Sequence, residues 1–195
     1  MPKIISACLA LMCGPLMIAL AQSAAYAEPT PATRAATVLA PVSSDPHATS
    51  ATYGDWVLVC QKVADEAGTA SRLCEVSQSV QVQGQSGPIA RLAISKTKSP
   101  AANVLTIVLP TNVLLTEGPK VAIDESDPIA QNLIWARCLP GGCFAEVALK
   151  DDVLAKWRAQ SERGRLDFKD GLGRSVAVPF SFRGLAPAYD ALSKE

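Results

Sequence analysis

The sequence predicts a mainly β protein, an antiparallel β-sandwich or barrel-like domain with about two short helices. Three observations predict this class. From residue 53 onward, short apolar runs alternate with turn residues. One of these runs, residues 74–83, alternates apolar and polar side chains, which places one face in a core and the other in water. Helical periodicity is confined to two short stretches, so a sandwich or barrel fits better than alternating β and α units.

The first 27 residues are typical of a cleavable signal peptide. Lys3 supplies the positive charge, residues 4–20 are apolar, and Ala25 and Ala27 give the small-x-small pattern that signal peptidase accepts. We therefore expect cleavage after Ala27, so that the mature chain begins at Glu28. A retained membrane anchor is the alternative. No later run reaches the roughly 18 apolar residues of a membrane span, so we expect no transmembrane segment after signal cleavage.

Residues 28–51 are predicted to form a flexible tether. They contain four prolines and no aromatic side chain. Such a composition buries too little apolar surface to offset the entropy lost on ordering the chain. A single domain is therefore expected over residues 52–195.

The charge balance of the chain argues against nucleic acid as a partner. The chain has 18 basic and 18 acidic residues, and removal of Lys3 with the signal leaves 17 against 18, a net charge of −1. Proteins that bind nucleic acid need a basic surface, because neutralisation of phosphates dominates their affinity.

The strands of the domain follow from the same alternation. Residues 74–83 place Cys74, Val76, Val80 and Val82 on the apolar face, with Gln78 as the exception. Further strands are predicted at residues 55–62, 89–95, 103–109, 120–124, 133–138, 143–149, 165–168 and 174–180. The run at 103–109 is apolar on both faces, as in a strand that is covered on both sides. Asp170-Gly171 is the expected turn between the last two strands.

Two short helices complete the prediction. Asp151 or Asp152 can cap a helix with Val153, Leu154 and Trp157 on its apolar stripe, and Gly164 is expected to close it. The second helix spans residues 185–192, where three apolar side chains share one face at helical spacing.

The four cysteines outside the signal, Cys60, Cys74, Cys138 and Cys143, are an even number, which predicts disulfides in an exported protein. Three pairings are open. Cys138 and Cys143 flank a four-residue turn, so they face each other across a hairpin. Cys60 shares a strand face with Trp56, and pairing this strand with the one that begins at Cys74 would bury a Cys60–Cys74 bridge. Zinc binding or redox activity is the alternative, although the spacings are not those of the usual motifs.

No catalytic residue, cofactor site or metal site is predicted. His47 is the only histidine and lies in the predicted tether, where it cannot be held rigidly as a general base. Acidic residues at Asp124, Glu125, Asp127 and positions 151–152 leave one alternative open, a carboxylate-dependent hydrolase acting on envelope polymers. Their positions in a turn and at a helix start also explain them, and the spacing of a calcium-binding loop is absent.

Several motifs follow one another between about Tyr53 and Leu192. They are Tyr53-Gly54-Asp55-Trp56 before Cys60, Cys74, Leu109-Pro110, residues 118–124, residues 138–145 and residues 178–185. Together, these motifs resemble the invasion-associated locus B (IalB) family of exported bacterial proteins. Residues 180–185 diverge from the family's usual Ser-Leu-x-Gly-Phe by a hydrophobic exchange. The resemblance implies a periplasmic, outer-membrane-associated or secreted protein without established catalytic residues, linked in some pathogens to entry into host cells.

Together, these observations predict an exported, non-enzymatic periplasmic or surface-associated β domain. We expect it to act through binding, in host-cell invasion or in envelope stress tolerance. The expected partner is an unknown protein or envelope component.

Overall fold

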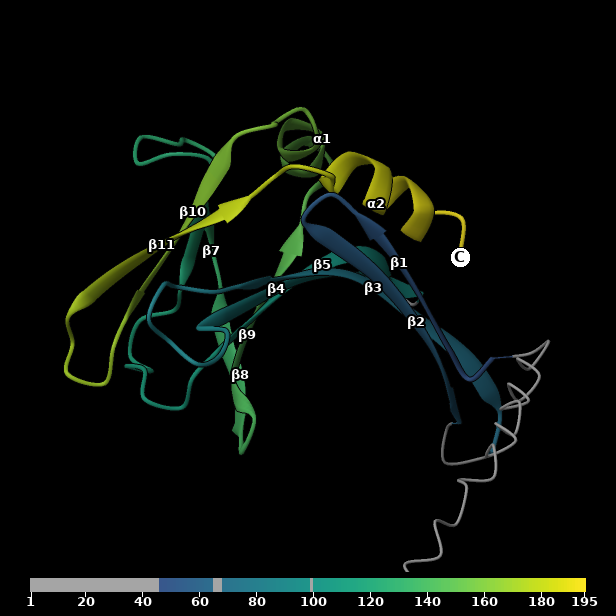
Figure 1. The fold of residues 1–195 in the computed structure, drawn as a ribbon, viewed down its shortest axis with the longest axis horizontal. Coiled ribbons are helices and arrows are strands. Elements are labelled where there is room, and N and C mark those ends of the chain that lie inside the picture. The colour runs from purple at the N-terminus through teal and green to yellow at the C-terminus, as the bar shows by residue number, and fades with distance from the viewer. Residues whose placement is uncertain (1–45, 65–67, 99) are drawn as a thin grey trace, which may run out of the picture. The chain divides into compact units, whose positions relative to one another are not determined.

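The computed structural model describes residues 46–64, 68–98 and 100–195. The predicted signal peptide, with Ala25 and Ala27, and residues 28–45 of the predicted tether lie outside the described residues. The described chain contains eleven strands and two helices (Figure 1): β1 (Ala48–Tyr53), β2 (Trp56–Ala64), β3 (Ala70–Val80), β4 (Ala90–Lys98), β5 (Ala101–Leu109), β6 (Lys120–Ala122), β7 (Gln131–Asn132), β8 (Ile134–Leu139), β9 (Gly142–Leu149), α1 (Asp151–Arg158), β10 (Arg163–Lys169), β11 (Ser175–Ser181) and α2 (Leu185–Leu192).

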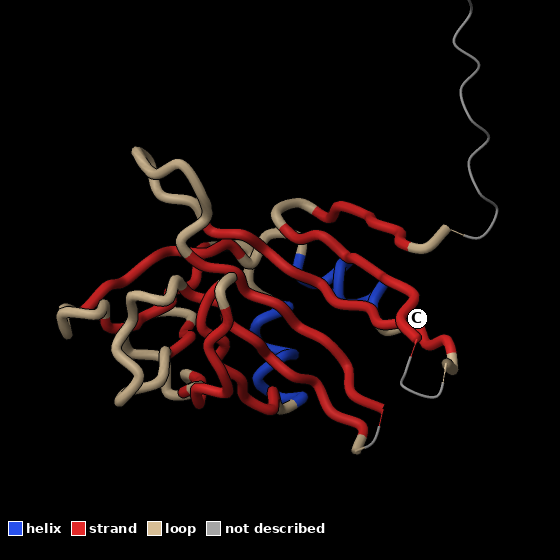
Figure 2. The backbone as a smooth tube through the Cα atoms, turned by 90° about the horizontal axis from the view of Figure 1, so that it is seen from below, coloured by secondary structure: helices blue, strands red, loops and turns tan. Residues whose placement is uncertain are grey.

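The strands form two antiparallel sheets. The first has seven strands in the order β1-β2-β3-β4-β5-β9-β8, and the second has four in the order β11-β10-β6-β7. Neither sheet closes on itself, so the described domain is a sandwich rather than a barrel (Figures 1 and 2). The predicted fold class is therefore confirmed.

The core lies on one face of the seven-stranded sheet. Alternate side chains of its central strands are fully buried there, among them Val76, Leu92, Ile94, Leu105 and Ile107. Both helices cover this same face (Figure 1), and α2 packs against β1, β2 and β3. Along β5 the alternate residues on the other face are only half-buried. The prediction that this strand is covered on both sides is therefore wrong, because neither of the two described helices lies over its second face.

The start of the domain differs from the predicted boundary. Strand β1 begins at Ala48, inside the segment that was predicted to be a tether, and pairs with β2 from Ala48 opposite Gln61 to Tyr53 opposite Trp56. His47 lies next to this pairing, because its carbonyl oxygen accepts a hydrogen bond from the Lys62 amide at 2.9 Å. The strand is held by backbone hydrogen bonds and keeps most side chains exposed, so it has no apolar alternation to detect.

Strand β3 also ends earlier than predicted. It stops at Val80, and Val82 is 39% exposed, because the chain turns away from the sheet at Gly84, where φ is +87°. Gln78, the exception in the apolar pattern, is only 6% exposed. Its buried position is not an irregularity of the strand, since its amide makes specific hydrogen bonds that are described below.

Of the two helices, α2 has the predicted bounds, whereas the ends of α1 differ. Lys150 is the N-cap residue of α1 and makes no side-chain cap. The first helical residue, Asp151, instead accepts a hydrogen bond from the Asn103 amide at 3.0 Å. Helix α1 ends at Arg158, and Gly164 belongs to β10. A side chain at Gly164 would collide with the ring of Phe180, which explains a glycine in this strand.

Candidate functional site

The first disulfide joins the two strands that sequence parity had paired. Cys60 on β2 lies opposite Cys74 on β3, and their sulfur atoms are bonded. Cys60 is buried and Cys74 is half-buried at the margin of the core. Because the Lys62 amide points to β1, the polar backbone atoms of Cys60, two residues earlier, also point to β1. The bridge therefore joins a pair that is not linked by backbone hydrogen bonds, where opposite side chains come closest.

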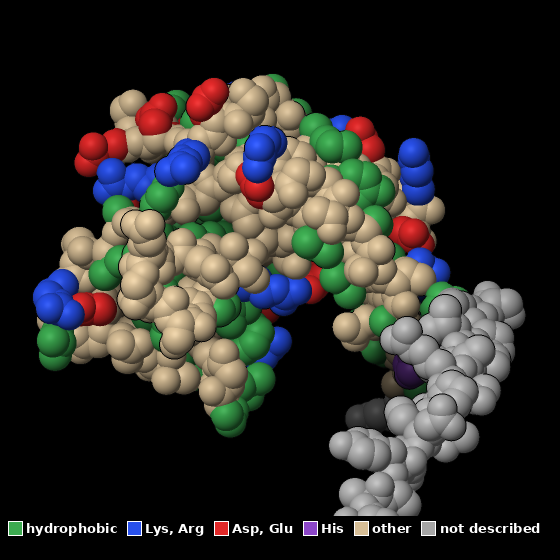
Figure 3. Space-filling view, viewed as in Figure 1, with side chains coloured by type: hydrophobic (Ala, Val, Ile, Leu, Met, Phe, Trp, Pro, Cys, Tyr) green, Lys and Arg blue, Asp and Glu red, His purple; other side chains and the backbone are tan. Residues whose placement is uncertain are grey.

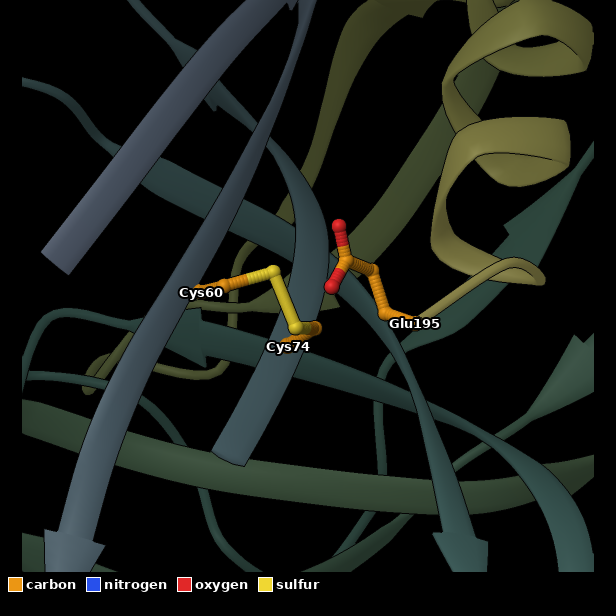
Figure 4. Close-up of side chains that lie close together, drawn as sticks. All are labelled: Cys60, Cys74 and Glu195. Atoms are coloured by element: carbon orange, nitrogen blue, oxygen red, sulfur yellow. A yellow bond between two sulfur atoms is a disulfide. The ribbon is translucent and has the colours of Figure 1, made fainter. Parts of the chain in front are cut away.

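A carboxylate lies beside this disulfide (Figure 4). A carboxylate oxygen of Glu195, which follows α2, lies within 4.8 Å of both sulfur atoms. The Arg72 guanidinium binds Glu195 at 3.0 Å and so holds it near the bridge. The sulfur atoms are bonded to each other, so they do not offer the thiolates that a zinc site would require.

The second disulfide joins Cys138 of β8 to Cys143 of β9, at opposite positions of a tight hairpin. Cys143 is buried and Cys138 is exposed. The pairing is the one that the four-residue turn had predicted. The two cysteines of this bridge are 5 residues apart in the sequence, whereas Cys60 and Cys74 are 14 residues apart.

The residues of two motifs meet where the two sheets join. Gly54 lies in the turn between β1 and β2 with φ of +59°, and a Cβ there would lie 2.8 Å from the Arg183 carbonyl oxygen. Gly184, at the start of α2, has φ of +93°, and its Cβ would lie 1.9 Å from the Tyr53 carbonyl oxygen. The Asp55 amide donates to the Arg183 carbonyl at 3.1 Å. The two backbone segments therefore approach too closely for any residue other than glycine.

The side chains of Gln78 and Trp56 complete this contact. The Gln78 amide nitrogen donates to the carbonyl oxygens of Asp55 and Ser181 at 3.1 and 3.2 Å, and its oxygen accepts from the Ser181 amide at 2.8 Å. The Trp56 indole donates to the same Ser181 carbonyl at 2.9 Å. We call Gly54, Asp55, Trp56, Gln78, Ser181, Arg183 and Gly184 the joint. One feature of the sequence indicates the role of Gln78, which is a polar residue at an apolar position of its strand.

An ion pair lies on the outer side of the joint. The Arg183 guanidinium donates to both oxygens of Asp55, at 2.6 and 3.1 Å. These hydrogen bonds lower the pKa of the Asp55 carboxyl, and the same contact raises the pKa of Arg183. The pair is open to solvent, so its contribution is structural and modest.

The acidic residues of the hydrolase alternative lie in two separate places. Between β6 and β7, Asp124 accepts hydrogen bonds from the Ser126 backbone and hydroxyl. Asp127 accepts from the amides of Ile123 and Ile129 at 2.8 and 2.9 Å. Asp151 and Asp152 lie at the start of α1 and are exposed. These contacts are those of a turn and a helix start, and they do not assemble a paired-carboxylate site.

Glu125 borders a groove of about 350 Å³ on the outer face of the four-stranded sheet, which Glu117 and Asp167 also line. All three acids have basic partners. Arg165 lies 3.6 Å from Glu125 and 2.6 Å from Asp167, and Lys169 binds Glu117 at 2.9 Å. The hydrogen bond to Asp167 raises the pKa of Arg165. The acids that line this groove are therefore ion-paired with basic side chains.

A second and larger groove, of about 640 Å³, opens beside β2, β3 and β4. Aliphatic side chains of Val59, Val63 and Leu73 line it together with Lys96 and Lys98. Figure 3 shows that the surface is hollowed beneath the seven-stranded sheet, on the side away from the helices. We call this site the fork groove. The sequence did not reveal it, because no single strand pattern shows where two strands separate.

The fold and these sites define a class: a disulfide-bridged, two-sheet β domain whose motif residues hold the sheets together. Neither described helix has the length and apolar character of a membrane span. The family described as "Invasion associated locus B (IalB) protein" matches residues 56–193, and the chain belongs to this family.

Curated relatives and a solved structure agree with this assignment. The chain is 25% identical over 143 residues to invasion protein B homologs of Brucella abortus strain 2308 and of B. abortus biovar 1 strain 9-941, covering 72% of this chain and 77% of theirs. The crystal structure of invasion associated protein B from Bartonella henselae has a TM-score of 0.62 at 16% identity, covering 75% of this chain and 95% of that one. This last likeness concerns the fold.

Proposed function

We propose that this chain is an exported, non-enzymatic domain of the bacterial envelope, periplasmic or surface-associated, that acts by binding a protein or another envelope component. The names of its curated relatives favour a role in host-cell invasion, and tolerance of envelope stress is the other role consistent with such a domain.

Two features support an extracytoplasmic location. The curated relatives are named invasion protein B homologs, and both cysteine pairs of the described domain form disulfides, which persist in oxidising compartments. The predicted signal peptide, with cleavage after Ala27, agrees with this location.

The observation that carries the binding role is the uncovered face of the seven-stranded sheet. Both helices lie on the other face (Figure 1). On the uncovered face, Val57, Val59, Val104, Val108 and Phe144 are only half-buried. A partly apolar surface that the described part of the domain leaves uncovered is typical of an interaction site.

Two measurements test the proposal. N-terminal sequencing of the periplasmic fraction should return Glu28, and a chain that begins at Met1 would reject export by cleavage. The oxidised mature chain should also sediment saturably with envelopes isolated from cells that lack the protein, without release of soluble fragments detectable by chromatography.

The hydrolase alternative predicts that soluble fragments are released from the envelopes. Release of soluble fragments that is lost in Asp124→Asn or Glu125→Gln, but kept in Asp152→Asn, would show catalysis and overturn the non-enzymatic role. Absence of saturable sedimentation would overturn the binding role.

A further inference from the structure

The fork groove lies where two hairpins separate. The β2–β3 hairpin continues to Ala64 opposite Ala70, and the β4–β5 hairpin continues to Lys98 opposite Ala101. The pairing between β3 and β4, however, ends at Glu75 opposite Ser95. In Figure 2 the two hairpins diverge toward their tips. Residues 70–74 of β3 and residues 96–98 of β4 therefore turn open edges toward each other, with no described strand between them.

The backbone groups on both edges point into this gap. The Lys62 amide donates to His47, so even-numbered residues of β2 face β1 and odd-numbered residues face β3. Alternation across the antiparallel register then directs the N–H and C=O groups of Arg72 and Cys74 toward β4, and those of Lys96 and Lys98 toward β3. Open edges of this kind are templates for an added strand.

The side chains around the gap specify the character of a guest. Val59 and Val63 are half-buried and Leu73 is 58% exposed, so alternate side chains of a guest strand would meet an apolar surface. An apolar residue as exposed as Leu73 gains most from a partner that covers it.

The charges around the gap are mainly positive. Arg72 is bound by Glu195, and Glu75 is paired with Arg91. Lys96 and Lys98 line the same groove, are exposed, and pair with no described acidic side chain. Two lysines that have no acidic partner among the described residues, beside an apolar surface, favour an acidic guest.

We propose that the fork groove binds an extended acidic peptide segment of an envelope protein, which adds as a short β-strand between β3 and β4. This proposal rests on the proposed binding function and names its site and the chemistry of its partner. The backbone edges supply affinity, Leu73 and the two valines accept apolar side chains, and the two lysines select acidic ones.

The test uses the full oxidised mature chain and a phage-displayed library of random dodecapeptides. Wild type should enrich peptides that alternate apolar and acidic residues. The double variant Lys96→Glu/Lys98→Glu should bind these peptides about tenfold more weakly and should itself enrich basic ones. The matched control, Lys150→Glu/Lys156→Glu, reverses two exposed lysines at α1, outside the groove, and should behave as wild type.

Strand addition has its own signature. A synthetic copy of the best peptide should protect the amides of Arg72, Cys74, Lys96 and Lys98 from hydrogen exchange. Methylation of alternate backbone nitrogens in the peptide should weaken binding at either parity, because one set of amides faces β3 and the other faces β4. Each methylated set should restore exchange only at the edge that it faces.

Several results would overturn the proposal: no enrichment on wild type, equal binding to both double variants, or binding without protection of these amides. Self-association of the chain that the peptide displaces would identify a second copy as the guest and reject the envelope partner. If the lysine double variant loses peptide binding but still sediments with envelopes, the proposed function stands and the fork groove is not its site. If peptides bind as described but envelopes do not, the groove stands and the proposed function fails.

Discussion

The joint and the fork groove lie on the same β3 strand and differ in how their polar groups are satisfied. At the joint, Gln78 and Ser181 exchange hydrogen bonds in a buried setting. In the fork groove, the β3 and β4 edges find no described strand, and Lys96 and Lys98 have no described ion pair. A buried polar group without a partner is costly, whereas an exposed one is satisfied by water.

This difference separates the parts of the domain that hold the fold from the part that can serve a partner. The Gly54-Asp55-Trp56 motif and residues 181–184 are occupied by contacts with each other. The fork groove contains none of the joint residues. The family motif residues of the joint therefore stabilise the fold, and the fork groove, which contains none of them, is the proposed binding site. The following predictions, from the largest effect to the smallest, test this separation.

Gly184→Ala should cost about 4 kcal/mol of the free energy of unfolding, because the new Cβ would lie 1.9 Å from the Tyr53 carbonyl oxygen. Gly173→Ala is the matched control, since that glycine has φ of +78° but nothing within 4 Å of a new Cβ. It should cost only the backbone strain, about 1–2 kcal/mol. Urea unfolding measures both variants, and equal losses would mean that the joint can move apart.

Replacing Cys60 and Cys74 by Ala should cost about 3 kcal/mol, since that bridge closes the longer loop. The same change at Cys138 and Cys143 should cost about 2 kcal/mol. Denaturant unfolding ranks the two variants. Non-reducing peptide mapping tests the pairing, and a peptide that joins Cys60 to Cys138 would contradict the strand register.

Gln78→Leu should lower the free energy of unfolding by about 2–3 kcal/mol, because it leaves buried backbone groups of Asp55 and Ser181 without their partner. Gln81→Leu makes the same exchange at an exposed position and should change stability by less than about 0.5 kcal/mol. If both variants lose stability equally, the hydrogen bonds of Gln78 do not hold the sheets together.

The Asp55–Arg183 pair should add a small, pH-dependent contribution. The hydrogen bond from Arg183 lowers the folded-state pKa of Asp55 below its usual value of 3.8. The contribution is therefore present above about pH 4 and is lost as the pH falls through the lowered pKa. In Asp55→Asn, the free energy of unfolding that is lost on acidification should be smaller than in wild type. The difference should be about 0.5 kcal/mol or less, because Arg183 is exposed. In a double-mutant cycle with Arg183→Gln, zero coupling energy would show that the pair contributes nothing.

Substitutions in the fork groove should leave the fold nearly unchanged. Leu73→Ser and Lys96→Glu/Lys98→Glu alter exposed side chains, so the free energy of unfolding should shift by less than about 0.5 kcal/mol. If either variant lost several kcal/mol of the free energy of unfolding, the fork groove would stabilise the fold as the joint does, and the two regions would not differ in this respect.

The sequence by itself determined the β class, most of the strands, helix α2 and which cysteines face each other. These features depend on local periodicity and on chain spacing. Val76 and Val80 alternate with polar residues because one face of β3 is buried. Cys138 lies opposite Cys143 because only four residues separate the two cysteines in a hairpin. Parity on β2 and β3 similarly places Cys60 opposite Cys74.

Only the tertiary structure decided the rest. Strand β1 depends on backbone pairing with β2, which leaves no apolar period. Gln78 looked like an interruption until Ser181, 103 residues away in sequence, supplied its partner. Gly164 was expected to end a helix, but the ring of Phe180 explains its place in β10. The fork groove arises because β3 and β4 stop pairing at Glu75. Each feature depends on contacts between segments far apart in the chain, and local patterns do not record those.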